Sequence, residues 1–199
     1  MLVVIEGLDF SGKTTYAKSI CERFDGKYYH FPNLNLESGQ LIDNILNNRN
    51  TNEIKYSNEA LQLLYQQNRL ETMSLIKKDI ESGKIVVCDR YGYSGYLYSL
   101  GLNCSEYFSK QMKRNLIKPD LRIYIRCSHQ VLYQRRKERS NIDNFEKDDF
   151  FQSKLYALYE KYIYSKKEKW YITHVDKSFE ENFKLICDKI DEMCNKVNN

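Results

Sequence analysis

One glycine-rich stretch near the start of the chain constrains the fold more than any other part of the sequence. It reads Gly7-Leu8-Asp9-Phe10-Ser11-Gly12-Lys13-Thr14 and fits the pattern of Gly, four residues, Gly-Lys and Ser or Thr. The apolar run 2–5 before it predicts a buried strand. After it, apolar residues recur at the spacing of one helix face: Ala17, Ile20, Cys21 and Phe24. A strand, a glycine turn and a helix N-terminus direct backbone N–H groups at one point, which predicts a polyphosphate site.

The loop also supplies candidate side chains for phosphates and for a metal ion. Lys13 can reach the β- and γ-phosphates, and the Thr14 hydroxyl is placed to bind Mg²⁺. The alternative is a chance glycine turn between a strand and a helix, which predicts no such contacts. We expect the phosphates to be held by the loop and the residue after it: Gly7, Leu8, Asp9, Phe10, Ser11, Gly12, Lys13, Thr14 and Thr15.

Short apolar runs alternate with helical patterns along the rest of the chain. We expect strands at 27–31, 85–88, 121–127 and 170–175, and helices within 33–56 and at 57–82, 105–116, 129–139, 149–166 and about 179–194. This alternation predicts an α/β fold of three layers, a five-stranded parallel sheet covered by helices on both faces. The whole of 1–199 is expected to form one domain, with a mobile lid at about 135–148.

Composition limits the classes of function. Lys and Arg number 31 against 27 Asp and Glu, a formal net charge of +4, which is lower than nucleic-acid binders usually carry. The six cysteines are scattered without metal-ligand spacing, and no apolar run is long enough to span a bilayer. We expect a cytoplasmic protein without a signal peptide, a membrane segment or a nucleic-acid partner.

A second cluster of polar residues is predicted at the same edge of the sheet. Asp89 ends the strand 85–88, where an acidic residue commonly holds Mg²⁺ in phosphate-loop enzymes, although it could instead cap the next helix. Arg90 offers a planar fork for a second phosphate. Tyr65 and Arg69 share a helix face and could stack on a base and bond its edge. Taken alone, Tyr65 and Arg69 are more typical of an aromatic residue packed in the core next to a charged residue on the surface.

Taken in order, these motifs resemble the thymidylate kinase family. The resemblance rests on GLDFSGKT, Phe31-Pro32, Tyr65 to Arg69, Asp89-Arg90-Tyr91 with Ser94-Gly95, and Lys118 to Leu121. It runs from residue 2 to about 158 and weakens in the last strand and helix. It implies phosphoryl transfer from MgATP to dTMP in dTTP synthesis, and a homodimer.

The resemblance also implies roles for single residues. The loop would bind ATP, with Arg135 on the adenine, and Asp89 and Thr14 would serve the metal. The dTMP pocket would be formed by Asp9, Phe31, Pro32, Tyr65, Arg69, Arg90, Ser94, Gly95, Tyr98 and Phe145. Within it, Asp9 would receive the 3′-hydroxyl and Tyr98 would crowd the 2′ position. The expected catalytic residues are Asp9, Lys13, Arg90 and Arg139.

Two positions depart from the family pattern. Phe10 stands where eukaryote-like members usually place a basic residue, so the charge for the transition state is expected from the lid, from Arg139 with Arg136 as a weaker candidate. Leu34 stands where an Arg usually contacts the acceptor phosphate. The alternatives are a kinase for another deoxynucleoside monophosphate or for a deoxynucleoside, a catalytically weak homologue, or a nucleotide-dependent binding module.

Overall fold

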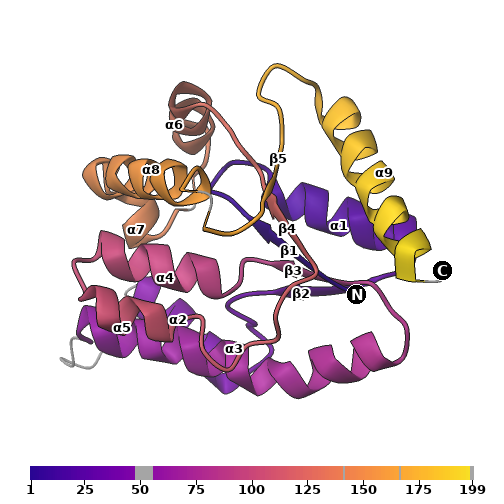
Figure 1. Ribbon diagram of the computed structural model, residues 1–199. Coiled ribbons are helices and arrows are strands. Elements are labelled where there is room, and N and C mark those ends of the chain that lie inside the picture. The colour runs from indigo at the N-terminus through magenta and orange to yellow at the C-terminus, as the bar shows by residue number, and fades with distance from the viewer. Residues whose placement is uncertain (48–55, 141, 166, 198–199) are drawn as a thin grey trace.

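The computed structural model describes residues 1–47, 56–140, 142–165 and 167–197, and Figure 1 shows a central sheet between layers of helices. In this part of the chain the sheet has five strands in the order β2-β3-β1-β4-β5, and every pairing is parallel. The strands are β1 (Leu2–Glu6), β2 (Lys27–His30), β3 (Val86–Asp89), β4 (Leu121–Tyr124) and β5 (Tyr171–Ile172). The central position of β1 explains the apolar run 2–5, because a central parallel strand is buried on both faces.

The helices follow the strands in alternation over the same described residues. They are α1 (Lys13–Phe24), α2 (Glu37–Leu46), α3 (Asn58–Glu81), α4 (Gly92–Gly101), α5 (Glu106–Gln111), α6 (His129–Lys137), α7 (Asn144–Lys147), α8 (Asp149–Ile163) and α9 (Phe179–Val197). In Figure 1, α1 and α9 lie on one side of the sheet and α3, α4 and α5 on the other.

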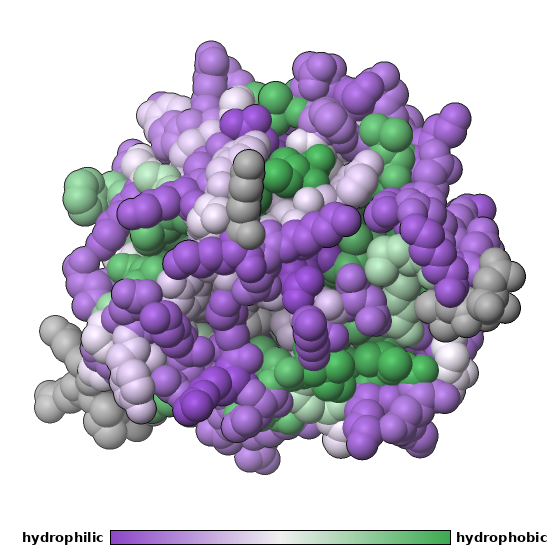
Figure 2. All heavy atoms as spheres, in the orientation of Figure 1, coloured by the Kyte–Doolittle hydropathy of each residue, from purple (hydrophilic) through white to green (hydrophobic). Residues whose placement is uncertain are grey.

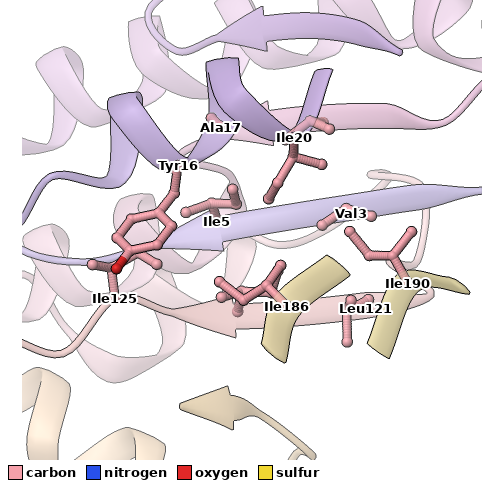
Figure 3. Packing of buried hydrophobic residues seen from close by; sticks show 11 residues of the cluster. Val3, Ile5, Tyr16, Ala17, Ile20, Leu121, Ile125, Ile186 and Ile190 are labelled. Atoms are coloured by element: carbon pink, nitrogen blue, oxygen red, sulfur yellow. The ribbon is translucent and has the colours of Figure 1, made fainter. Parts of the chain in front are cut away.

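The two faces of β1 have separate cores, because successive side chains of a strand point to opposite sides. Val3 and Ile5 pack with α1 and with Ile186 and Ile190 of α9, as Figure 3 shows. Leu2 and Val4 pack on the other face with Ile76 of α3. The sheet is thus held on both sides, and its carboxyl edge, where β1 runs into the loop, stays fixed.

The predicted fold class is confirmed, with local differences. The fourth and fifth strands are shorter than expected, ending at Tyr124 and Ile172, and the helix expected at 105–116 is limited to α5. The expected segment 33–56 contains α2, but residues 48–55 lie outside the described residues. The segment expected to form the lid, about 135–148, contains α7, which starts with a capping box between Asp143 and Glu146.

Helix α4 has no counterpart among the sequence predictions. It contains three glycines and several tyrosines, which have low intrinsic helix propensity, so the sequence gives little local signal for it. Almost all of its side chains are buried, against α3, α5 and α8. Tertiary packing stabilises this helix in place of propensity.

No helix in the described ranges is both long and apolar enough to cross a membrane. Figure 2 shows that hydrophilic side chains cover most of the face seen in Figure 1, with hydrophobic residues gathered in separate patches.

Candidate functional site

The carboxyl ends of β1 and β3 and the start of α1 border a cavity of about 700 Å³. Its lining brings together most of the predicted site residues: Asp9, Phe10, Gly12, Lys13, Thr14, Thr15, Phe31, Pro32, Tyr65, Arg69, Arg90, Ser94, Gly95, Tyr98, Arg135, Arg139 and Phe145. The other four, Gly7, Leu8, Ser11 and Asp89, are buried and outside the lining. Segments far apart in the sequence therefore meet at the edge where parallel sheets bind ligands.

The loop leaves the N-terminus of α1 open. Gly12 precedes the helix with φ 92°, a left-handed conformation that glycine adopts without strain, and no side chain caps α1. By contrast, serines cap α3, α5 and α6. Because the first N–H groups of a helix have no partner within it, the start of α1 can accept an anion.

Lys13 is held close to this opening. It is only 6% exposed, and its Nζ donates to the Leu8 carbonyl at 3.1 Å and lies 3.5 Å from Asp9 Oδ1. Burial and the nearby charge of Arg90 lower the pKa of Lys13. The loop thus binds the ammonium group of the first residue of α1 through Leu8 and Asp9.

Thr14 and Asp89 form an oxygen pair beside the loop. Thr14 Oγ1 donates to Asp89 Oδ2 at 2.6 Å, and Tyr28 and His30 also contact this oxygen, each at 3.2 Å. Asp89 Oδ1 is buried without a hydrogen-bond partner among the described residues. Burial would raise the pKa of Asp89, but the hydrogen bond with His30 and the charge of Lys13 lower it to about 2. Asp89 is therefore ionised at neutral pH, and it does not cap α4.

Asp9 joins the loop to the end of β3 and to α4. Its Oδ1 accepts a hydrogen bond from Arg90 Nη2, and its Oδ2 accepts one from the Tyr98 hydroxyl at 2.6 Å. Burial would raise the pKa of Asp9, but the charges of Arg90 and Lys13 outweigh it and hold the pKa below its usual range. A carboxylate has about four lone-pair sites, so Asp9 can accept a further donor at Oδ2.

Helix α3 forms one wall of the cavity. Arg69 is 2% exposed, and its Nε donates to Gln66 Oε1 at 3.2 Å, whereas its Nη2 has no partner in the described part of the chain. Burial lowers its pKa to about 10, so the guanidinium stays charged. Gly95 of α4 leaves the space that the guanidinium occupies, because a Cβ there would stand 2.4 Å from Nη2. Tyr65 lines the same wall, so an aromatic ring and a free buried donor face one cavity.

The segment expected to form the lid, about 135–148, lines another side of the cavity. Arg135 Nη1 donates to the Phe10 carbonyl at 3.0 Å, which places this guanidinium over the loop. Arg139 lines the cavity and is exposed. Arg136, in contrast, is buried, pairs with Asp149 and donates to the Glu146 carbonyl at 3.3 Å, and it is outside the lining. The structure thus places Arg139, the stronger of the two candidates from the sequence, on the cavity, and the weaker candidate Arg136 away from it.

The structure shows the surroundings of Phe10 and Leu34, the two positions that depart from the family pattern. Phe10 packs against the hydrophobic cluster formed by α4, α6 and α8. Leu34 is 50% exposed and outside the cavity lining. The backbone beside it is fixed by Asn68, whose side chain bonds both the N–H and the carbonyl of Asn33, at 2.6 and 3.1 Å. The chain at this point is therefore ordered without supplying a charge.

The sequence analysis missed six residues of the lining: His30, Leu46, Gln62, Glu138, Asp143 and Glu146. Gln62 is 1% exposed, and its Nε2, like Arg69 Nη2, is buried without a partner among the described residues. The two residues are seven positions apart on α3, hence on one helix face, a signal that was present in the sequence. Burial raises the pKa values of Asp143 and Glu146, and the charge of Asp9 adds to the effect.

An uncapped helix N-terminus, a buried lysine and an adjoining cavity lined by Arg69 and Arg90 are typical of a phosphate-loop phosphotransferase with a second substrate site. The family model of thymidylate kinase matches residues 5–186. The chain belongs to the thymidylate kinase family, and it is a nucleoside monophosphate kinase that phosphorylates dTMP to dTDP.

The fold agrees with this assignment. A solved structure of thymidylate kinase from Candida albicans matches with a TM-score of 0.80 at 24% sequence identity. The match covers 98% of this chain and 92% of that chain.

Proposed function

We propose that the chain transfers the γ-phosphoryl group of MgATP to dTMP with the loop as donor site and the α3–α4 side of the cavity as acceptor site. The observation that carries this assignment is the convergence of two cations, Lys13 and Arg90, on Asp9 between the two sites. Lys13 belongs to the donor loop and Arg90 to the end of β3. The two phosphates brought together there would meet opposite charge from both sides.

The described residues fit a magnesium ion. Thr14 and Asp89 supply oxygen ligands 2.6 Å apart, and Asp89 Oδ1 is a buried acceptor that lacks a partner. No cluster of three or more His, Cys, Asp or Glu side chains suited to a metal occurs in the described ranges. Mg²⁺ is usually held by one or two protein groups together with substrate phosphates, so this pair is sufficient. The ion would neutralise charge on the ATP phosphates.

The remaining groups position the acceptor. Arg90 would bind the dTMP phosphate, and Asp9 would accept the 3′-hydroxyl at its remaining lone pair. Tyr65 would stack on thymine while Arg69 Nη2 donates to the base edge. Tyr98, fixed by its hydrogen bond to Asp9, would exclude a 2′-hydroxyl. No general base is required, because the acceptor phosphate is already ionised; the protein contributes position and charge.

The segment 135–148 would act as a lid on this single domain. Arg135 would cover the adenine, Phe145 the acceptor, and Arg139 would approach the transferring group on closure. The ring of Phe145 packs on Phe151 at the start of α8, with centroids 5.2 Å apart, which anchors the segment. Closure would exclude water and so prevent simple hydrolysis of ATP.

ADP formation from MgATP with a panel of acceptors tests this function: dTMP, dUMP, dGMP, dCMP, UMP and thymidine, each with and without a chelator. Strong stimulation by dTMP, little by UMP or thymidine, and loss with the chelator are expected. A deoxynucleoside kinase would respond to thymidine instead, but it needs a carboxylate base near the 5′-hydroxyl. The first acid after β2 is Glu37, which is outside the cavity lining. Turnover without any acceptor response would favour a binding module.

Gly95→Ala is expected to raise the KM for dTMP about tenfold and leave the KM for ATP unchanged. The new Cβ would stand 2.4 Å from Arg69 Nη2 and would displace the group that bonds the base. Gly101→Ala is the matched control, because the atoms nearest to a Cβ at that buried glycine of α4 belong to the side chains of Phe151 and Leu155. Steady-state kinetics with each substrate varied measures both; equal effects of the two variants would point to helix packing.

We infer that the enzyme forms a homodimer through α3. Leu63 and Leu70 are 53% and 39% exposed and lie on one side of that helix, seven residues apart. An apolar stripe of this kind suits a second copy of the same helix. Sedimentation of Leu63→Lys is expected to show monomers at concentrations where the parent is dimeric. Leu75→Lys is the control, as Leu75 is 52% exposed on another side of α3.

We also place the enzyme in a reducing, cytoplasm-like compartment. All six cysteines are free thiols in the structure, as is usual where disulfides do not form.

A further inference from the structure

One buried acid lies directly before the loop and has no role in the reaction as described so far. Glu6 ends β1, is fully buried and is outside the cavity lining. Four donors converge on its carboxylate. Oε1 accepts the N–H groups of Tyr91 at 2.8 Å and Ser94 at 3.0 Å, and Oε2 accepts the hydroxyls of Ser94 at 2.6 Å and Tyr159 at 3.2 Å. A carboxylate is the form that satisfies four donors at once.

The two backbone contacts make Glu6 the cap of α4. Tyr91 is the N-cap position of this helix and supplies no side-chain cap of its own. Ser94 is the third helical residue, whose N–H a capping side chain normally binds. Glu6 supplies that acceptor from another strand. It therefore fixes the start of α4 relative to the end of β1, which is the loop side of the site.

The turn that Glu6 fixes contains Arg90. This arginine has φ 67°, a left-handed conformation that a non-glycine residue adopts only when its surroundings impose it. Its backbone N–H donates to the Ile5 carbonyl at 2.9 Å, and the next N–H, that of Tyr91, is bound by Glu6. Two adjacent residues of β1 thus hold the backbone on either side of the strained position.

The side chain of Arg90 is connected to Glu6 as well. Arg90 Nη1 donates to Ser94 Oγ at 3.0 Å, and Ser94 Oγ donates in turn to Glu6 Oε2. The other end of the guanidinium, Nη2, donates to Asp9. Arg90 is therefore held by one carboxylate directly and by a second through a hydroxyl. Charge-assisted bonds of this kind fix a guanidinium in one orientation more firmly than neutral ones do.

We propose that Glu6 is a positioning residue for the acceptor phosphate: it sets the orientation of Arg90 through Ser94 and the cap of α4. The proposal rests on the proposed role of Arg90 as the clamp on dTMP. Burial holds the pKa of Glu6 above its ordinary value against the hydrogen bond of Ser94 and the charge of Arg90. Burying a carboxylate at the end of β1 is energetically unfavourable, and groups with pKa values shifted in this way are concentrated at functional sites.

A double-mutant cycle tests the proposal. Glu6→Gln keeps the shape and one carbonyl acceptor but removes the charge that orders Ser94. It is expected to raise the KM for dTMP about tenfold while the KM for ATP changes less than about twofold. Ser94→Ala is expected to have a similar effect, and the double variant should be no worse than the poorer single one, because both changes break one connection.

Tyr159→Phe is the matched control. It removes a hydroxyl that lies 3.2 Å from Glu6 Oε2 and 3.0 Å from Ser94 Oγ, but it leaves the hydrogen bonds from Arg90 to Ser94 and from Ser94 to Glu6 in place, so the KM for dTMP should stay near that of the parent. The rise in melting temperature that dTMP causes provides a second measurement on each variant. This rise should be smaller than in the parent for Glu6→Gln and unchanged for Tyr159→Phe.

Other outcomes would overturn the proposal. Additive effects of about a hundredfold in the double variant would mean that Glu6 does not act through Ser94. If Glu6→Gln leaves the kinetics unchanged, or raises the KM values for ATP and dTMP equally, then Glu6 only caps α4 and does not position the acceptor phosphate. If the parent enzyme itself shows no turnover with dTMP, the proposed function fails, and this result is distinguishable from failure of the Glu6 proposal.

Discussion

Lys13→Ala is expected to lower kcat for dTMP phosphorylation by about 10²–10³-fold, the magnitude typical of removing one preorganised charge from a transition state. The ammonium group is already buried at the loop and hydrogen-bonded to the Leu8 carbonyl. Little free energy is therefore needed to reorient it when the phosphoryl group is transferred. The effect should fall on kcat more than on the KM for dTMP, because the acceptor is bound by other groups.

The fold should survive this substitution. Removing Lys13 takes one contact from Asp9, which still pairs with Arg90 and Tyr98, so no carboxylate is left buried alone. Lys18→Ala is the matched control: it removes a charge from the same helix at an exposed position outside the cavity lining. Thermal unfolding and single-turnover kinetics separate lost chemistry from lost structure. Near-normal turnover of Lys13→Ala would exclude the loop from the mechanism.

The parts of the site that the sequence predicts are those built locally. The loop from Gly7 to Thr14 carries its geometry in its own glycines and in the strand and helix beside it. Asp89 and Arg90 were predictable because parallel strands end at one edge, so residues distant in sequence must meet there. Tyr65 and Arg69 needed only the helical period to be placed on a common face.

The parts that were missed depend on tertiary contacts. Helix α4 is stabilised by burial and by a cap from Glu6, which is 85 residues from Tyr91 in sequence, so no local pattern could show it. Gln62 shares a helix face with Arg69, which the sequence did show, but its burial in the cavity depends on how α3 packs against α2. Arg136 and Arg139 lie three residues apart, so their spacing does not distinguish their roles. The pairing of Arg136 with Asp149 shows that Arg136 stabilises the structure.

Arg139→Ala is expected to lower kcat by about 10²–10³-fold with a much smaller change in the KM for dTMP. The loop has no cation at position 10, where Phe10 packs into a hydrophobic cluster, and the proposed mechanism therefore draws the additional charge from the segment 135–148. The guanidinium of Arg139 lines the cavity and has no hydrogen bond or ion pair within the described ranges, which leaves it available for the transferring phosphoryl group. An interaction made only in the transition state appears in kcat.

Two neighbouring cations serve as controls for Arg139. Lys137→Ala removes a charge that lies 4.4 Å from the centre of the Tyr133 ring and outside the cavity lining, so kcat should stay near that of the parent. Arg136→Ala removes a buried guanidinium that pairs with the exposed Asp149 and donates to the Glu146 carbonyl, so it should lower the melting temperature more than Arg139→Ala does. Arg139→Lys should recover part of the rate, because it restores the charge without the planar fork. A pure KM effect of Arg139→Ala would mean that this residue binds substrate in the ground state, and that the transition-state charge is supplied by Arg135, which already contacts the loop.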